Sequence, residues 1–253
     1  MSQSIRRLVG LAAVLAVLTG TAAGCGGERQ ERAVTVEPKE AGGESSKSES
    51  SEDAEGAEAP EDAAGDQLSG AQARKALLSV SDLPAGWTLT PNEEDDESED
   101  SVSPAKCKDV LDALDDNSID AAAEAEANFN KGGAFGTILS QTISSYADDV
   151  DPNVVQDIAD AFSECPSFTS TDSEGEVSKV TVAPMSFANL GDQTLAVSMT
   201  LESSMFTVSL NLAYVVIGHN VVALIQGGLA GADGAELEKL TKQAIKKLEK
   251  TVA

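Results

Sequence analysis

The sequence has 253 residues, enough for one or two domains, and a formal charge of −26 at pH 7. Residues 1–24 hold two arginines and no acid, so the remainder carries −28. This charge argues against a nucleic-acid-binding protein, because phosphate contacts need Lys and Arg. It also argues against a domain that lies flat on anionic lipid. Only 4% of the residues are aromatic, so aliphatic side chains must fill the core.

The first 25 residues have the features of an export signal. Arg6 and Arg7 precede an uncharged apolar run, residues 8–18, that is shorter than the ~20 residues of a membrane-spanning helix. Small residues then lead to Cys25. This order resembles a bacterial lipoprotein signal, with Ala22 at the position where leucine is usual. The resemblance implies cleavage after residue 24 and a diacylated, palmitate-bearing Cys25 that anchors the protein at the outer face of the cell membrane. A plain secretory signal is the alternative.

The segment after Cys25 is acidic and has no apolar periodicity. Residues 26–67 contain thirteen Asp or Glu and four Lys or Arg. Such a segment buries too little apolar surface to fold, so we expect residues 25–67 to be a disordered tether ahead of a domain at 68–253. A flexible chain of this length reaches roughly 35 Å. A second acidic run, residues 93–100, is expected to be an exposed loop, since it lacks the spaced ligands of a calcium loop.

Four helices are expected in the domain. Their starts are marked by capping residues or by a proline in the first turn, at Ser69, Ser103-Pro104, Asp151-Pro152 and Asp233. The first ends near Ser79, before a turn at residues 81–87. Glu236, three residues after Asp233, completes a capping box. The apolar faces consist of Ala73, Ala76 and Leu77; Cys107, Val110, Leu111 and Leu114; Val154, Val155, Ile158, Phe162 and Cys165; and Leu237, Leu240, Ala244 and Leu248.

Between these helices the apolar residues alternate with polar ones, which predicts half-buried strands. The pattern is clear at residues 194–201, 206–216 and 221–226, and weaker at 123–130, 137–146 and 177–182. Short connections between them favour antiparallel neighbours. The predicted fold is therefore α+β, with an antiparallel sheet of five or six strands and helices packed on one side.

Two cysteines lie in the predicted domain. Export would place Cys107 and Cys165 in an oxidising compartment, where we expect them to form one disulfide. Two buried free thiols are the alternative. Zinc-type ligand spacing is absent and the chain has one histidine, so we expect no metal and no other cofactor.

Motifs for catalysis are also absent from the sequence. The single histidine, His219, lies beside Gly218 in a predicted hairpin turn, where a turn residue is favoured over a catalytic base. No nucleophile elbow, phosphate-binding loop or dinucleotide fingerprint is present. Trp87 is expected to anchor a turn. The sequence therefore favours a protein that is not an enzyme, and carboxylate chemistry on the cell envelope is the alternative.

The order of elements in residues 68–253 resembles the PknH-like extracellular sensor domain of actinobacteria. The resemblance rests on Leu77-Leu78, the segment Asp82-Leu83-Pro84-Ala85-Gly86-Trp87, the two cysteine helices, the paired strands through Val222 and the closing helix. It implies an antiparallel sheet with helices that form a ligand-binding cleft outside the membrane. Kinase members carry a kinase domain, a transmembrane helix and two disulfides, so direct signalling across the membrane is not implied for this chain.

Together these features predict a membrane-anchored binding or sensor module with an unknown small-molecule or envelope ligand, whose contact residues the sequence does not identify. Two alternatives stay open. One is a lipid or glycolipid carrier with an apolar cavity between sheet and helices. The other is a protein-interaction partner in the cell envelope.

Overall fold

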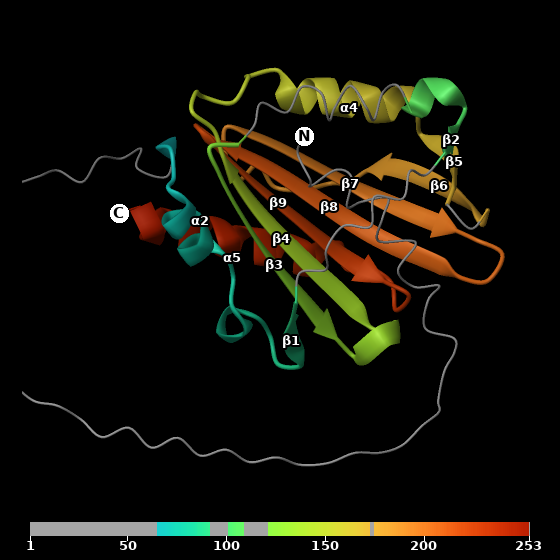
Figure 1. Cartoon of the computed structure of the whole chain (residues 1–253), viewed down its shortest axis with the longest axis horizontal. Helices are drawn as coiled ribbons and strands as arrows, with labels where there is room; N and C mark the ends of the chain where they lie inside the picture. The colour runs from blue at the N-terminus through green and yellow to red at the C-terminus, as the bar shows by residue number, and fades with distance from the viewer. Residues whose placement is uncertain (1–64, 92–100, 109–120, 173–174, 253) are drawn as a thin grey trace, which may run out of the picture.

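The computed structural model of the protein describes residues 65–91, 101–108, 121–172 and 175–252 (Figure 1). The signal, Cys25, the tether up to residue 64 and the acidic run at 93–100 lie outside the described residues. So do Val110, Leu111 and Leu114 of the second predicted helix, of which only residues 105–108 are described as helical.

The domain is built on one antiparallel sheet of nine strands in the order β1-β3-β4-β9-β8-β7-β6-β5-β2. The strands are β1 (Trp87–Thr90), β2 (Ser101–Ser103), β3 (Ala123–Lys131), β4 (Thr137–Ser145), β5 (Ser167–Thr171), β6 (Val177–Pro184), β7 (Gln193–Glu202), β8 (Thr207–Ile217) and β9 (Asn220–Gly228). The α+β class is confirmed, but the predicted count of five or six strands was too low. The sequence pattern missed β1, β2 and β5, which have three to five residues each and are too short for alternation to stand out.

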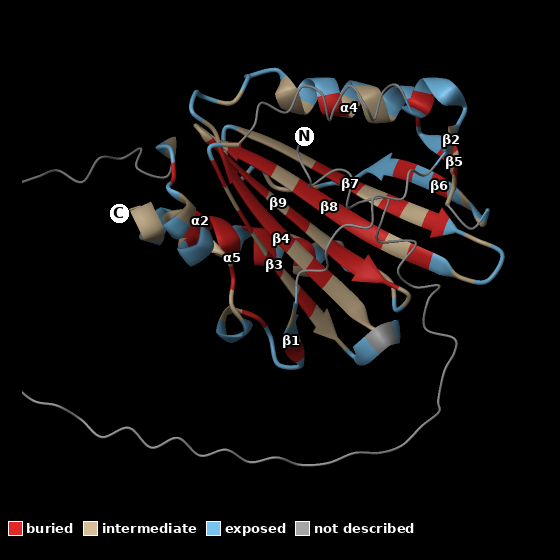
Figure 2. Ribbon diagram, in the orientation of Figure 1, coloured by how far each residue is buried: buried red, intermediate tan, exposed pale blue. Residues whose placement is uncertain are grey.

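Helices cover both faces of the sheet, so the prediction of helices on one side was wrong. α2 (Gly70–Ala76) and α5 (Gly234–Val252) pack on one face, and α4 (Val154–Glu164) lies on the other (Figure 1). Strand β8 shows the division, because Ala213 belongs to the core under α2 and α5 while Leu212 belongs to the core on the α4 side. The alternation of apolar and polar residues predicted strands that are buried on one face only. In the structure, much of the length of the central strands is buried on both faces (Figure 2).

The interface between α5 and the sheet is filled with aliphatic side chains. The inward residues of α5 have no exposed surface, namely Leu237, Leu240, Ala244 and Leu248. They share one core with Ile143, Val222 and Leu224 of the central strands. Burying a leucine side chain is worth about 2 kcal/mol, so this face contributes strongly to the stability of the fold.

Polar side chains of β4 hold the segments on either side of α2. Ser69 caps α2 as predicted, in a capping box with Gln72. Ahead of the helix, the Leu68 amide donates to Ser145 Oγ at 2.8 Å. After it, the Leu78 amide donates to the buried Gln141 Oε1 at 2.7 Å. Each such bond contributes about 1 kcal/mol and fixes where the helix lies on the sheet.

The start of α5 differs in one detail from the predicted capping box. Asp233 Oδ1 accepts hydrogen bonds from the amides of Ala235 and Glu236, as an N-cap should. The Glu236 carboxylate, however, accepts from Gln226 Nε2, and the Asp233 amide donates to Gln226 Oε1. In a complete capping box the Glu236 carboxylate would accept from the Asp233 amide. Here the buried Gln226 of β9 bonds to both groups instead, and it fastens the helix to the sheet.

Candidate functional site

A row of polar side chains runs along β3 and β4 on the sheet face opposite α2 and α5. The alternate residues Ala123, Ala125 and Ala127 are buried toward α2, so the residues between them point to the other face. We call this row the polar strip; it consists of Glu124, Glu126 and Asn128 of β3 and their cross-strand partners Ser144, Thr142 and Ser140 of β4. Its two glutamates keep intermediate exposure. They lie next to an edge of the described sheet, because β1 pairs only with residues 128–131 of β3.

The side chains of the polar strip contact one another. Asn128 Nδ2 donates to Glu126 Oε1 at 2.7 Å, and Ser144 Oγ donates to Glu124 Oε2 at 3.5 Å. These contacts hold the two carboxylates in place along β3. Carboxylate and amide groups side by side can accept from and donate to the hydroxyl groups of a ligand.

Both tyrosines of the chain lie near the polar strip, Tyr146 directly after β4 and Tyr214 beyond β9. Burial raises the pKa of the Tyr146 phenol, and the negative charge of Glu124 raises it further against a lowering hydrogen bond with Ser144. Burial also raises the pKa of Tyr214, which neighbours Tyr146, far above its usual range. Both phenols therefore stay protonated at neutral pH and can act as neutral hydrogen-bond donors. Tyr146 directly follows the strip at the end of β4, and Tyr214 lies on β8, two strands from β4 and level with Thr142.

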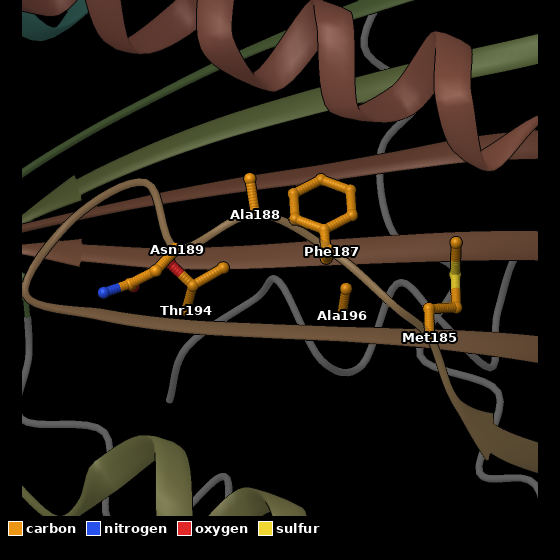
Figure 3. Close-up of a pocket in the computed structure, with 6 residues that line it drawn as sticks. All are labelled: Met185, Phe187, Ala188, Asn189, Thr194 and Ala196. Carbon is orange, nitrogen blue, oxygen red and sulfur yellow. The ribbon is translucent and has the colours of Figure 1, made fainter.

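A second candidate is a small hollow on the α5 side of β7 (Figure 3). It measures about 190 Å³ and is lined by Met185, Phe187, Ala188, Asn189, Thr194 and Ala196. Ligand pockets usually enclose about 300–1,000 Å³, so this hollow is small for a metabolite. It also has no ionisable side chain in its lining, which leaves the polar strip as the better candidate.

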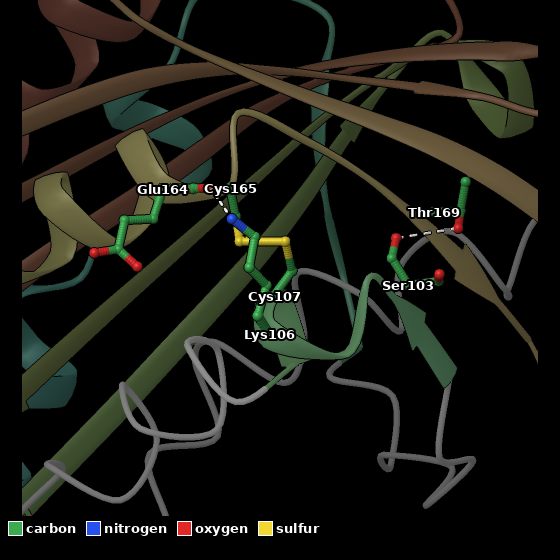
Figure 4. The surroundings of a disulfide bond; sticks show 6 residues. All are labelled: Ser103, Lys106, Cys107, Glu164, Cys165 and Thr169. Atoms are coloured by element: carbon green, nitrogen blue, oxygen red, sulfur yellow. Dashed lines mark hydrogen bonds between the residues drawn. A yellow bond between two sulfur atoms is a disulfide. The ribbon is translucent and has the colours of Figure 1, made fainter.

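The disulfide pins the segment after β2 to the end of α4 (Figure 4). Cys107 and Cys165 are joined with a Cα–Cα distance of 5.6 Å, and both are buried in the core on the α4 side. Two hydrogen bonds flank the bridge: Lys106 Nζ donates to the Glu164 carbonyl, and Thr169 Oγ1 donates to the Ser103 carbonyl. The predicted pairing is thus present and serves to hold an edge of the sheet.

His219 has the structural role expected of a turn residue. Its Nδ1 lies 3.1 Å from the Tyr146 carbonyl, and its Nε2 lies 3.3 Å from Asp149 Oδ1. Its backbone amide donates to the Gly65 carbonyl at 2.9 Å. At the neighbouring Gly218 a Cβ atom would come within 2.5 Å of that same carbonyl, so glycine is required for this contact. The turn between β8 and β9 therefore holds the first described residues of the chain.

Trp87 is buried in the core under α2 and α5, with Lys131 Nζ 5.7 Å from its ring centroid. It anchors the turn after Asp82 as predicted. Within the described ranges, no three His, Cys, Asp or Glu side chains are grouped so that they could hold a metal ion. None of the described helices combines the length and apolar character needed to cross a membrane.

The sequence did not identify the polar strip, although it carried a usable signal. The segment Ala123-Glu124-Ala125-Glu126-Ala127 alternates a small apolar residue with a carboxylate. Once β3 pairs with β4, this alternation places two acids on the sheet face opposite α2 and α5. The neighbours of β3 could not be known from its own residues.

Comparison with known proteins identifies the fold. No family model matches the sequence, and a search of curated proteins finds no match. The extracellular domain of PknH from Mycobacterium tuberculosis is similar in structure, with a TM-score of 0.57 and 16% identity over 74% of this chain and 99% of that chain. An Rv0999 ortholog from Mycobacterium smegmatis gives a TM-score of 0.41 at 12% identity, over 66% and 92% of the two chains. The similarity to the PknH domain therefore confirms the fold that the sequence predicted.

Proposed function

We propose that the chain is an extracytoplasmic lipoprotein whose domain binds a ligand at the polar strip and does not catalyse a reaction. The fold, shared with the extracellular domain of PknH, supports a place outside the membrane. The signal with Cys25 supports the lipid anchor. The observation that carries the binding role is the pair of carboxylates Glu124 and Glu126, held beside Asn128 on a partly covered sheet face.

The chemistry of the polar strip fits a neutral ligand rich in hydroxyl groups, such as a carbohydrate fragment of the cell envelope. Carboxylates accept hydrogen bonds from hydroxyl groups, and an amide both donates and accepts. The protonated phenols of Tyr146 and Tyr214 add donors and flat apolar surfaces. An anionic ligand would be repelled by the two glutamates.

A thermal-shift assay with soluble cell-wall saccharide fragments tests the site. A fragment at a hundred times its dissociation constant should stabilise the chain by about 2.7 kcal/mol. The double variant Glu124→Gln/Glu126→Gln should lose this shift. A matched control, Glu164→Gln/Glu202→Gln, changes two exposed carboxylates elsewhere and should keep it. The proposal fails if no fragment raises the midpoint, or if the strip variant responds like the control.

The anchor is tested separately by Cys25→Ala. We expect this variant to leave the membrane fraction while the domain stays folded, because the two other cysteines form the disulfide. Retention of the variant in the membrane fraction would show that Cys25 is not the point of attachment.

The lipid-carrier alternative receives no support from the face under α2 and α5. Its core is closed by side chains without exposed surface, so an acyl chain would have to displace Leu240 or its neighbours. Co-purified lipid detected by mass spectrometry would reopen this alternative.

A further inference from the structure

Positive charge in this acidic chain is concentrated in one layer of the fold. Of the eleven Lys and Arg among the described residues, seven lie in α2 and α5, which contain only three Glu. The other described residues contain four Lys against fifteen Asp and Glu. Helix α4, on the opposite face of the sheet, has three acids and no base. The described domain therefore has a basic layer on one side and an acidic one on the other.

The lysines of α5 form a stripe along its outer surface. Lys239, Lys242, Lys246 and Lys250 follow one another at spacings of three or four residues and are all exposed. This spacing places them on one face of a helix, over a length of about 16 Å. The buried residues of α5 lie on the opposite face, so the stripe points directly away from the sheet. Arg74 and Lys75, also exposed, extend it onto α2.

Most of these cations have no carboxylate partner within the described part of the chain. Lys242 pairs with Glu238, and Lys247, beside the stripe, pairs with Asp82. No described residue forms an ion pair with Lys239, Lys246, Lys250, Arg74 or Lys75. No carboxylate of the described residues lies at ion-pair distance from these five charges, so we treat them as available to an anionic surface.

The basic layer lies next to the point where the chain reaches the domain. Gly65 is held by the turn between β8 and β9, and α2 starts five residues later. α2 packs beside the C-terminal part of α5 (Figure 1). A lipid on Cys25 would hold the domain within roughly 35 Å of the bilayer by the predicted tether. At that range the surface meets the domain at a high effective concentration.

We infer that the α2–α5 face docks the domain on the anionic headgroups of the membrane that carries the anchor. The charge of −28 that remains after residues 1–24 are removed opposes such contact. However, the acidic α4 layer faces away when the lysine stripe faces the bilayer. In this orientation the polar strip, which is on the α4 side of the sheet, points away from the membrane. The inference rests on the proposed anchoring and gives the anchored domain a defined orientation.

The test uses the chain without residues 1–24, coupled through Cys25 to a maleimide lipid in vesicles. The maleimide supplies the anchor, so the result does not depend on whether cells attach lipid to Cys25. The Cys25→Ala experiment tests that lipid attachment separately. Amine-reactive labelling read by mass spectrometry reports each lysine. In phosphatidylglycerol vesicles, Lys239, Lys246 and Lys250 should react at least about fivefold more slowly than in phosphatidylcholine vesicles, the factor that one cation near an anionic surface provides. The effect should vanish between ~0.1 M and ~1 M salt.

Matched variants separate docking from general charge attraction. The double variant Lys246→Gln/Lys250→Gln should return Lys239 to its rate in phosphatidylcholine vesicles. The control Lys106→Gln/Lys179→Gln removes the same charge from exposed positions outside the stripe and should leave Lys239 protected. Equal labelling in the two kinds of vesicle overturns the inference. Equally slow labelling in both kinds of vesicle is one form of this result. An intramolecular contact between the lysines and the acidic tether would give it.

Discussion

The contact between η3 (Val80–Asp82) and α5 gives a prediction that can be worked out from the structure. Lys247 Nζ lies 2.6 Å from Asp82 Oδ2, and each side chain keeps only about a quarter of its surface exposed, 28% and 27%. The Ser79 amide and hydroxyl donate to the same carboxylate oxygen at 2.8 and 2.6 Å. We predict that Lys247→Met destabilises the domain at neutral pH but not in acid.

The magnitude follows from the Asp82 carboxyl. Partial burial opposes its ionisation, but Lys247 and Ser79 outweigh this effect and lower the pKa of Asp82 from 3.8 to about 2. A shift of this size corresponds to about 2 kcal/mol at most. Because Ser79 accounts for part of it and water screens the pair, we expect Lys247→Met to lose about 1 kcal/mol. The melting midpoint should fall by about 2–4 °C.

The pH dependence has a definite sign. A carboxyl whose pKa is lower in the folded state stabilises the fold fully above its unfolded pKa of 3.8, and this contribution is lost as the pH falls through about 2. The gap between wild type and Lys247→Met should therefore be constant at pH 5–7 and close between about pH 4 and pH 2.

Urea denaturation of both proteins across this pH range measures the gap. Lys246→Met is the control, because Lys246 is exposed and has no partner among the described residues, and it should change the free energy of unfolding by less than about 0.5 kcal/mol. A gap that persists at pH 2, or a control as destabilised as Lys247→Met, would refute the reasoning.

Three further predictions concern the core, the tyrosines and the disulfide. Leu240→Ala removes a side chain without exposed surface and should destabilise the domain by about 2–5 kcal/mol in urea denaturation. In an ultraviolet pH titration, Tyr146 and Tyr214 should both ionise above the usual pKa of about 10, and stability should fall as the pH rises past 10, since only the unfolded state then releases its protons. Replacing Cys107 and Cys165 by alanine reopens a loop that spans 58 residues in sequence and should lower the free energy of unfolding by about 4 kcal/mol on the chain-entropy model, measured against the oxidised protein.

The long elements of the fold were predictable because their patterns are strong over many residues. The alternation in residues 206–216 predicted β8, and the caps at Ser69 and Asp233 placed the starts of α2 and α5. Strand β5 was missed because its five residues follow Pro166 directly and are mostly Ser and Thr. Such a segment becomes a strand through pairing with β6, which is a tertiary effect.

The placement of helices on both faces could not be predicted from single segments. The apolar face of α4 resembles that of α5 in sequence, and nothing within either helix says which side of the sheet it covers. That choice depends on β8, where Leu212 and Ala213 supply apolar surface to both sides. The polar strip was missed for the same reason, since the surroundings of Glu124 are formed by Ser144 of the neighbouring strand and by Tyr146 just after that strand.

The way Gly65 is fastened determines how the domain carries mechanical load. A pull on the preceding chain is transmitted to the turn between β8 and β9 through the His219 amide, and to Asn220 Nδ2, which donates to the Asp66 carbonyl at 2.8 Å. These residues join two strands in the middle of the nine-stranded sheet, so the force is spread over hydrogen bonds on both sides. α2, which follows Gly65 in sequence, is shielded from that force as long as these two bonds hold. For a domain attached in this way, a pull on the chain ahead of Gly65 would load the centre of the sheet before it loads the first helix.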